Sequence, residues 1–179
     1  MSELIIIRGN SGSGKTTVAQ TLHQQLPGSL LIDQDVVRRD MLQAHDHPGN
    51  LSIDLMETIA RFGLAHEQIV ILEGILSKAV YGDMLARLAK DFDRSQAYYY
   101  DLTLAETVQR HQTRDKAGSF GPDTLAKWFI PHDVLGWPGE VMIPASWKIA
   151  DTVHCILQKS KSEISESLIL AVEKSTEES

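Results

Sequence analysis

The stretch Gly9–Thr16, near the start of the chain, has the residue types and spacing of a loop that binds phosphate groups. It fits the pattern G-x-x-x-x-G-K-[ST], in which glycines let the backbone curl so that several N–H groups point at phosphate oxygens. The amine of Lys15 can then reach a β- or γ-phosphate, and the Thr16 hydroxyl can ligate Mg²⁺. The predicted phosphate-binding residues are Gly9, Asn10, Ser11, Gly12, Ser13, Gly14, Lys15, Thr16 and Thr17.

Polar residues follow a second apolar run, Ser29–Ile32. We expect the Asp35 carboxylate to orient an acceptor hydroxyl near the terminal phosphate and to take its proton. Arg38 follows about one helical turn later, and we expect Asp33 and Arg38 to contact the acceptor. The same residues also fit a helix N-terminus with acidic caps, an alternative without a chemical role.

A third carboxylate, Glu73, ends the apolar run Gln68–Leu72 and is followed by Gly74. A carboxylate at such a strand end can hold a Mg²⁺-bound water or a substrate hydroxyl, much as GTPases and many ATPases use an Asp. We therefore predict that Glu73 contacts both metal and acceptor. The alternative is a strand-end charge that faces solvent.

Two arginines, Arg110 and Arg114, share one helical face and precede a break at Gly118–Pro122. A basic helix end that leads into a flexible segment is typical of a lid, which we place at roughly residues 110–140. Arginines on such a lid can stabilise a transferring phosphoryl group. The alternative is an ordinary solvated helix face.

The elements that must position these residues alternate between strands and helices. The predicted strands are Leu4–Arg8, Ser29–Ile32, Gln68–Leu72, Ala97–Leu102 and Thr152–Leu157. This order is typical of an α/β fold in which helices cover both faces of a parallel sheet, and ligands bind beyond the carboxyl ends of the strands.

Helical signals lie between the runs. Thr103 and Glu106 form a capping box, and a last helix is expected at roughly residues 161–174. An apolar stripe with helical spacing is formed by Leu51, Leu55, Ile59 and Phe62. No linker divides the chain, so we expect one domain over residues 1–179. The Trp residues are expected to pack in the core or lid rather than to stack on bases.

Composition narrows the functional classes. The 179-residue chain has a net charge of −7, which argues against general attraction to nucleic acid or to an anionic membrane. Its one cysteine, Cys155, excludes an internal disulfide and favours a reducing compartment. No signal peptide or apolar run of membrane-spanning length is visible. We expect a cytoplasmic protein.

The combination of the phosphate loop, Asp35 with Arg38, Glu73 and the lid arginines resembles the small P-loop kinases of the zeta-toxin, chloramphenicol phosphotransferase and polynucleotide kinase group. Those families carry x-D-x-x-R after the second strand, with the Asp as catalytic base. The resemblance implies a P-loop NTPase fold with a five-stranded parallel sheet in the order 2-3-1-4-5 and a lid. Asp33 departs from the group, where Asn is frequent, and the segment Trp137–Glu140 matches no substrate class.

The sequence thus predicts an ATP-dependent phosphotransferase that uses Mg²⁺ and acts on a hydroxyl of a small molecule or nucleotide. A 5′-hydroxyl RNA or DNA kinase remains within this hypothesis, although the acidic composition gives it little support. An alternative from another class is a nucleotide-dependent switch or binding module. The guanine-reading Asn-Lys-x-Asp motif of GTPases is absent.

Overall fold

The computed structural model describes residues 1–66, 68–112 and 122–160, and the chain divides into two compact units, Met1–Ser146 and Trp147–Ser179. The first unit contains a parallel sheet in the order β2-β3-β1-β4-β5, which is the predicted fold class and order. Its strands are β1 (Glu3–Gly9), β2 (Leu30–Asp33), β3 (Ile69–Gly74), β4 (Arg94–Tyr100) and β5 (Val141–Ile143).

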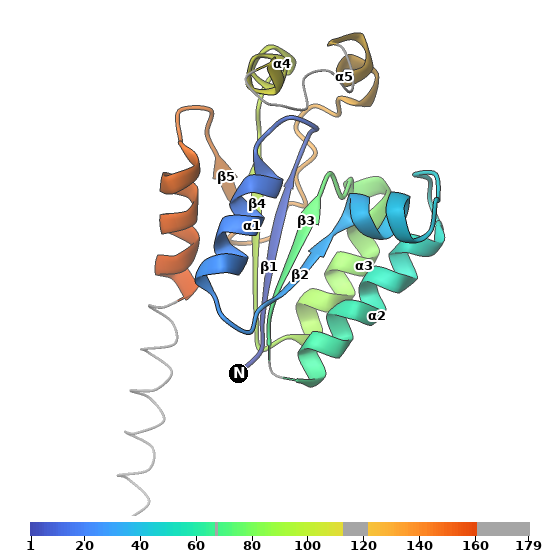
Figure 1. Cartoon of the computed structure of the whole chain (residues 1–179), viewed down its shortest axis with the longest axis vertical. Coiled ribbons are helices and arrows are strands. Elements are labelled where there is room, and N and C mark those ends of the chain that lie inside the picture. Colours follow the sequence, from blue (N-terminus) through green and yellow to red (C-terminus); the bar gives the residue numbers. More distant parts are fainter. Residues whose placement is uncertain (67, 113–121, 161–179) are drawn as a thin grey trace, which may run out of the picture. The chain divides into compact units, whose positions relative to one another are not determined.

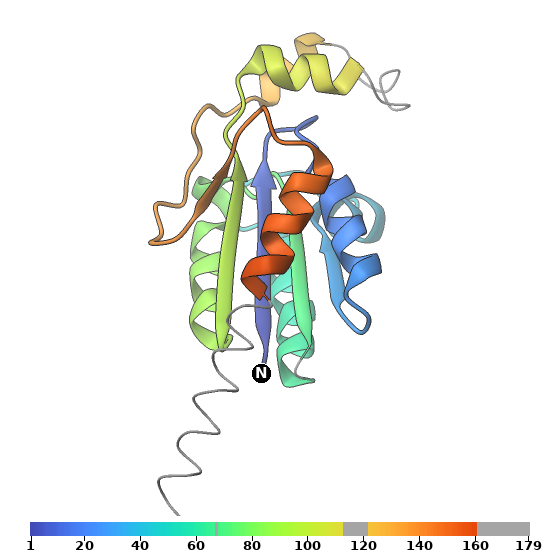
Figure 2. The ribbon, with the colours of Figure 1, turned by 90° about the vertical axis from the view of Figure 1, so that its left-hand side faces the viewer.

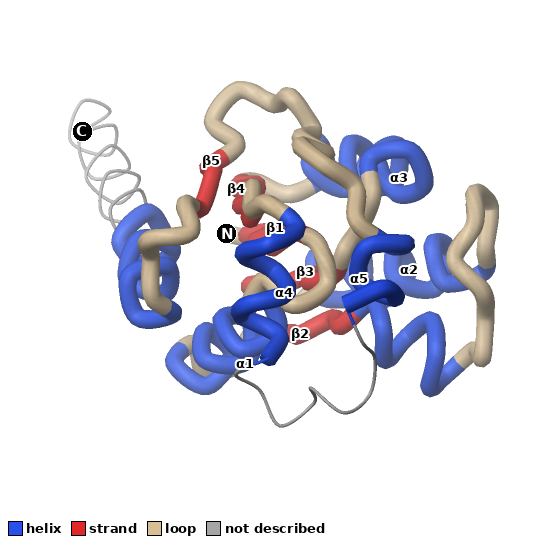
Figure 3. Tube along the Cα trace, turned by 90° about the horizontal axis from the view of Figure 1, so that it is seen from above, coloured by secondary structure: helices blue, strands red, loops and turns tan. Residues whose placement is uncertain are grey.

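Helices cover both faces of this sheet (Figure 1). The helical elements are α1 (Lys15–Gln25), the π-helical turn η1 (Val36–Met41), α2 (Leu51–Ala65), α3 (Lys78–Asp91), α4 (Leu104–Gln112) and α5 (Pro122–Trp128). Helix α1 lies on one face, and α2 and α3 lie on the other. Helices α4 and α5 lie beyond the carboxyl ends of the strands (Figures 2 and 3), the side where this class of sheet binds ligands.

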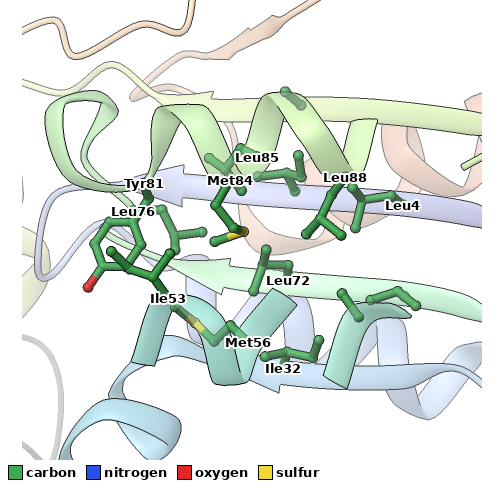
Figure 4. Packing of buried hydrophobic residues seen from close by; sticks show 14 of the residues in the cluster. Leu4, Ile32, Ile53, Met56, Leu72, Leu76, Tyr81, Met84, Leu85 and Leu88 are labelled. Carbon is green, nitrogen blue, oxygen red and sulfur yellow. The ribbon is translucent and has the colours of Figure 1, made fainter. Parts of the chain in front are cut away.

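The central strand β1 explains why the sheet is buried. Its residues Leu4–Ile7 have no exposed surface, because β3 and β4 pair with its edges and helices cover its faces. Leu4 and Leu72 pack against Met56 of α2 and Leu88 of α3 in the main core cluster (Figure 4). Burying each such side chain contributes roughly 1.5–3 kcal/mol, and this rigid strand carries the loop that follows it.

The helix predicted around the stripe that begins at Leu51 is α2, and the stripe faces the core only in part. Its middle residues, Leu55 and Ile59, are partly buried and pack against the core cluster, whereas Leu51 and Phe62 at its ends are 69% and 59% exposed. The fully buried positions of α2 include Ala60 and Gly63. A Cβ at Gly63 would lie 2.5 Å from Cγ2 of Val70, so this face of the helix approaches the sheet closely.

The predicted fifth strand, Thr152–Leu157, is wrong. Residues 149–160 of the second unit are helical, and the fifth strand is β5. The β-branched residues suggested a strand, but Thr152, Val153 and Ile156 are buried at helical spacing. The Lys148 N–H donates to the Asp151 carboxylate and so caps the first turn.

Three further sequence predictions concern helices. The capping box before α4 is confirmed, since the Glu106 carboxylate accepts from the N–H and hydroxyl of Thr103. The helix expected at 161–174 lies outside the described residues. Cys155 is half-buried. In the part of the chain that the structure describes, no helix has the length and apolarity needed to cross a bilayer.

Candidate active site

The loop between β1 and α1 has the backbone shape that its glycines predict. Gly12 and Gly14 adopt φ angles of 88° and 113°, a region that side chains disfavour. At Gly9 a Cβ would lie 2.8 Å from Cβ of Tyr100, so a side chain does not fit there. Helix α1 begins at Lys15 without a side-chain cap. Its first N–H groups and the positive end of its dipole are therefore available to an anion.

Two buried oxygen atoms beside this loop have no hydrogen-bond partner among the described residues. They are Oγ of Ser13 and Oε2 of Glu73. Buried polar atoms are normally satisfied, so an orphaned pair beside a phosphate-type loop indicates a polar ligand or ion. Lys15 is also buried, with its Nζ 3.4 Å from the carbonyl oxygen of Asn10.

Glu73 has the most strongly perturbed carboxyl group of the site. Burial raises its pKa to about 7, the Lys15 charge opposes that shift, and Asp33 adds to it. The side chain is 2% exposed, and the Thr16 side chain lowers its pKa slightly against the effect of burial. Hard oxygen donors of this kind fit Mg²⁺, which would use the Thr16 hydroxyl and the Glu73 carboxylate. The solvent-facing alternative for Glu73 is wrong.

The residues after β2 include one that caps the following helical turn and others whose side chains form ion pairs. Oδ1 of Asp33 accepts from the N–H groups of Asp35 and Val36, at 2.7 and 3.2 Å, so this carboxylate does act as a cap. The Asp35 side chain is 57% exposed and forms ion pairs with Arg38 at 2.9 Å and with Arg39 at 3.1 Å. π-Helical turns such as η1 occur frequently at functional sites.

Arg38 and Tyr81 hold the loop that follows η1. Arg38 is buried and donates to the Ala44 carbonyl at 3.1 Å, while the Ala44 N–H donates back to the Arg38 carbonyl at 2.8 Å. The Tyr81 hydroxyl of α3 donates to the Asp46 carboxylate at 2.7 Å. Side-chain bonds from two elements therefore fix residues 43–46 in place.

These elements enclose a pocket of about 820 Å³ within the first unit. Its lining includes seven of the residues that the sequence predicts for the site: Ser11, Lys15, Thr16, Asp33, Asp35, Arg38 and Glu73. Further lining residues are Arg39, Gln43, Ala44, His45, Asp46, Gly74, Ile75, Ser77, Lys127, Trp128 and Ile130. Residues predicted to bind phosphate thus share one cavity with the strand-end carboxylates.

Arg110, the predicted lid arginine that the structure describes, is not among the residues that line this pocket. Arg110 donates to the carbonyls of Ser13 and Ala145, both at 2.7 Å, and its guanidinium lies 5.8 Å from the Tyr100 ring centroid. It supports the phosphate loop in this conformation, so a role at the phosphoryl group stays a prediction that requires it to move. Arg114 lies outside the described residues.

One known protein family matches most of this chain. A family model described as an AAA domain matches residues 4–126. The chain belongs to this AAA domain family. Its fold is that of the small P-loop kinases, as the resemblance implied. No match was found among curated proteins.

Solved structures with this fold cover nearly the whole AAA domain chain. A gluconokinase from Sinorhizobium meliloti 1021 has a TM-score of 0.65 and 17% identity, over 94% of this chain and 97% of its own. A tunicamycin resistance protein from Deinococcus radiodurans has a TM-score of 0.63 and 19% identity, over 90% of this chain and 96% of its own. An APS kinase from Mycobacterium tuberculosis, in complex with AMPPNP and APS, has a TM-score of 0.61 and 15% identity, over 88% of this chain and 96% of its own.

Sequence reasoning missed several groups that line the pocket. Trp128 is 40% exposed and lines the pocket, with the Arg39 guanidinium 5.8 Å from its ring centroid, whereas core or lid packing was expected. Lys127 and Asp46 also line the pocket. One available signal was Arg8, a charge directly after the apolar run Leu4–Ile7, because a buried charge requires partners elsewhere in the fold.

Proposed function

We propose that this protein is an ATP-dependent phosphotransferase that moves the γ-phosphoryl group to a hydroxyl of a small molecule or nucleotide. The observation that carries this proposal is the shared pocket, in which Lys15, Thr16 and Glu73 stand beside the phosphate loop while Asp35 and Arg38 line the same space. A nucleotide-dependent switch also uses a strand-end carboxylate for its metal ion, as Glu73 would be used, but it does not require a second carboxylate such as Asp35 to take a proton from an acceptor.

In the proposed reaction, the loop amides and Lys15 bind the β- and γ-phosphates of ATP. The acceptor oxygen bonds to the γ-phosphorus while the bond to the β–γ bridging oxygen breaks, and the hydroxyl proton passes to the Asp35 carboxylate. The products are the phosphorylated acceptor and ADP. Mg²⁺, held through Thr16 and Glu73, would supply charge neutralisation at the phosphate oxygens. Arg38 lines the acceptor side and orients Asp35 through their ion pair.

The named neighbours support this class of reaction, since a gluconokinase and an APS kinase share the fold. Their identities of 17% and 15% leave the acceptor of this chain open. The seven pocket residues that the sequence predicts provide the additional support, because they include the residue types that phosphoryl transfer needs.

The test is ATP consumption, measured with and without a panel of acceptors that includes nucleosides, sugars, aminoglycosides, chloramphenicol and oligonucleotides. We expect at least one acceptor to raise turnover well above the basal rate. Slow turnover that no acceptor changes would contradict the proposal and favour a nucleotide-dependent switch.

A further inference from the structure

The segment of residues 129–140, here called the strap, connects α5 to β5 and has no helix or strand of its own. Long connections without regular structure are commonly functional. The residues that precede or begin the strap, Lys127, Trp128 and Ile130, form one wall of the pocket. What fixes the strap therefore fixes that wall.

Asn10 attaches the start of the strap to the phosphate loop. Its side-chain amide donates to the Ile130 carbonyl at 2.8 Å, and its side-chain oxygen accepts from the Ile130 N–H at 2.9 Å. Asn10 is 4% exposed, so this two-bond pairing is shielded from water. The Asn10 side chain is thus engaged by the strap, and only its backbone remains to serve a phosphate.

Arg8 attaches the strap further along. This residue has no exposed surface, and its guanidinium donates to the Asp133 carbonyl at 2.9 Å and to the Asp133 carboxylate at 2.7 Å. It also bonds to the Leu76 carbonyl at 2.9 Å and pairs with Glu140 at 3.4 Å. Hydrogen bonds to a buried charge are strong, and their loss leaves buried carboxylates unpaired.

The strap's own groups complete this anchorage. The Asp133 N–H donates to the Tyr99 hydroxyl at 2.9 Å, and the Asp133 carboxylate accepts from the Lys78 N–H at the start of α3. The Glu140 carboxylate accepts from the N–H groups of Leu135 and Gly136, which folds the strap back on itself. The segment is therefore held at both ends and across its middle.

We propose that Arg8 and Asn10 are positioning residues that clamp the strap to the strand and loop that carry the phosphates, and so fix the acceptor-side wall of the pocket. The clamp itself is a structural claim, whereas its effect on an acceptor depends on the proposed phosphotransferase function. Both residues lie on the same strand-to-loop connection, two positions apart. The wall is thereby held in register with the phosphate loop although it lies far along the chain.

The test uses 5-fluorotryptophan and ¹⁹F NMR, with Trp128→Phe to assign the Trp128 resonance. Three variants are compared: Arg8→Met, Asn10→Ala and Arg94→Met. Arg94→Met is the matched control, because Arg94 pairs with the buried Glu3 at the opposite end of β1, at 3.4 Å. A clamp predicts that the Trp128 resonance shifts or broadens in the first two variants and stays in place in Arg94→Met.

An unchanged Trp128 resonance in folded Arg8→Met and Asn10→Ala would overturn the proposal, as would an equal change in Arg94→Met. Should Arg8→Met fail to fold, Asn10→Ala decides, since it leaves no buried charge unpaired. With an acceptor identified, Arg8→Met should raise the acceptor KM at least about 10-fold, roughly the effect of 1.4 kcal/mol, while kcat changes less than about 3-fold. The same rise in the acceptor KM in Arg94→Met as in Arg8→Met would contradict a positioning role for Arg8. A protein without kinase activity would refute the proposed function and leave the NMR result valid.

Discussion

The two sides of the pocket are built by different means. The phosphate side comes from consecutive residues, Gly9–Thr16, whose backbone is shaped by glycines and anchored by a buried strand and a helix N-terminus. The proposed acceptor side comes from η1 together with the loop at residues 43–46 that follows it, and from α5, which lies far from both in the sequence. Its parts are fixed by side-chain bonds such as Tyr81 to Asp46 and Asn10 to Ile130.

The two sides of the pocket therefore depend on different interactions. A backbone-built site tolerates change in the surrounding side chains, because its N–H groups remain in place as long as the glycines do. A side-chain-built wall depends on individual distant bonds, so one substitution can move it. We therefore expect mutations on the two sides to separate nucleotide binding from acceptor use.

The largest effect is expected for Asp35→Asn. The amide keeps the shape of the carboxylate but cannot accept the hydroxyl proton, so kcat should fall by about 10²–10⁴ while nucleotide affinity is retained. The matched control is Asp40→Asn, an exposed carboxylate on the same η1 turn that does not line the pocket. Steady-state kinetics and a nucleotide-binding titration check both. A near-normal kcat in Asp35→Asn would remove Asp35 from the mechanism.

Lys15→Ala should come next. It removes the only lysine beside the phosphate loop among the residues that line the pocket, so a folded protein should lose about 10²–10³ in turnover, the usual effect of one stabilising donor. Lys127→Ala, on the opposite wall, should instead raise the acceptor KM and leave nucleotide affinity intact. Circular dichroism confirms folding, and ATP turnover provides the comparison. Undiminished turnover in Lys15→Ala would contradict its assignment.

Glu73→Gln tests the buried carboxyl group through stability. The pKa of Glu73 is raised from 4.5 to about 7 in the folded protein, mainly by burial. Its protonation therefore stabilises the fold fully below about pH 4.5, and that stability is lost as the pH rises through 7. When the pH rises from 5 to 8, the free energy of unfolding of the wild type should fall by roughly 2–3 kcal/mol relative to that of Glu73→Gln. Urea unfolding without nucleotide or metal measures this difference, and a difference independent of pH would exclude the shift.

The smallest effect is expected at Gly74, where the two sides of the pocket meet. A Cβ there would lie 2.3 Å from Oε1 of Gln34, the atom that accepts the Leu76 N–H. Gly74→Ala should cost about 1–3 kcal/mol of stability through overpacking. Gly82→Ala on α3 meets its nearest neighbouring atom at 3.4 Å and should stabilise by about 0.5–1 kcal/mol. Thermal unfolding of both variants provides the measurement, and equal melting temperatures would count against close packing at Gly74.

The phosphate loop and four of the five strands could be predicted because their signals are local. An apolar run, a glycine pattern and a helical stripe specify β1, the loop and α1 without information from the rest of the chain. The strand-end rule likewise placed Asp35 and Glu73 beside the loop, where both line the pocket. Their chemical roles stay predictions.

The predictions that failed concern features that depend on contacts between residues far apart in the sequence. The buried face of α2 depends on the close approach of Gly63 to Val70, which no stripe of large residues reveals. The helix at residues 149–160 contains β-branched residues that favour a strand in isolation. Trp128 reaches the pocket because the strap is clamped by Asn10 and Arg8. The charge of Arg8 at the end of the apolar run Leu4–Ile7 signalled a distant partner without identifying it.

The proposed reaction requires one pocket to place a triphosphate against the loop and to aim an acceptor at its terminal phosphorus. A crystal structure with Mg²⁺ and the non-hydrolysable analogue AMP-PNP tests this most directly. We expect the β- and γ-phosphates to bond to Lys15 and the loop amides, the metal to contact Thr16, and the Asp35 carboxylate to face the γ-phosphate across the cavity. Phosphates bound away from the loop, or an Asp35 side chain that points out of the cavity in that complex, would contradict the claim.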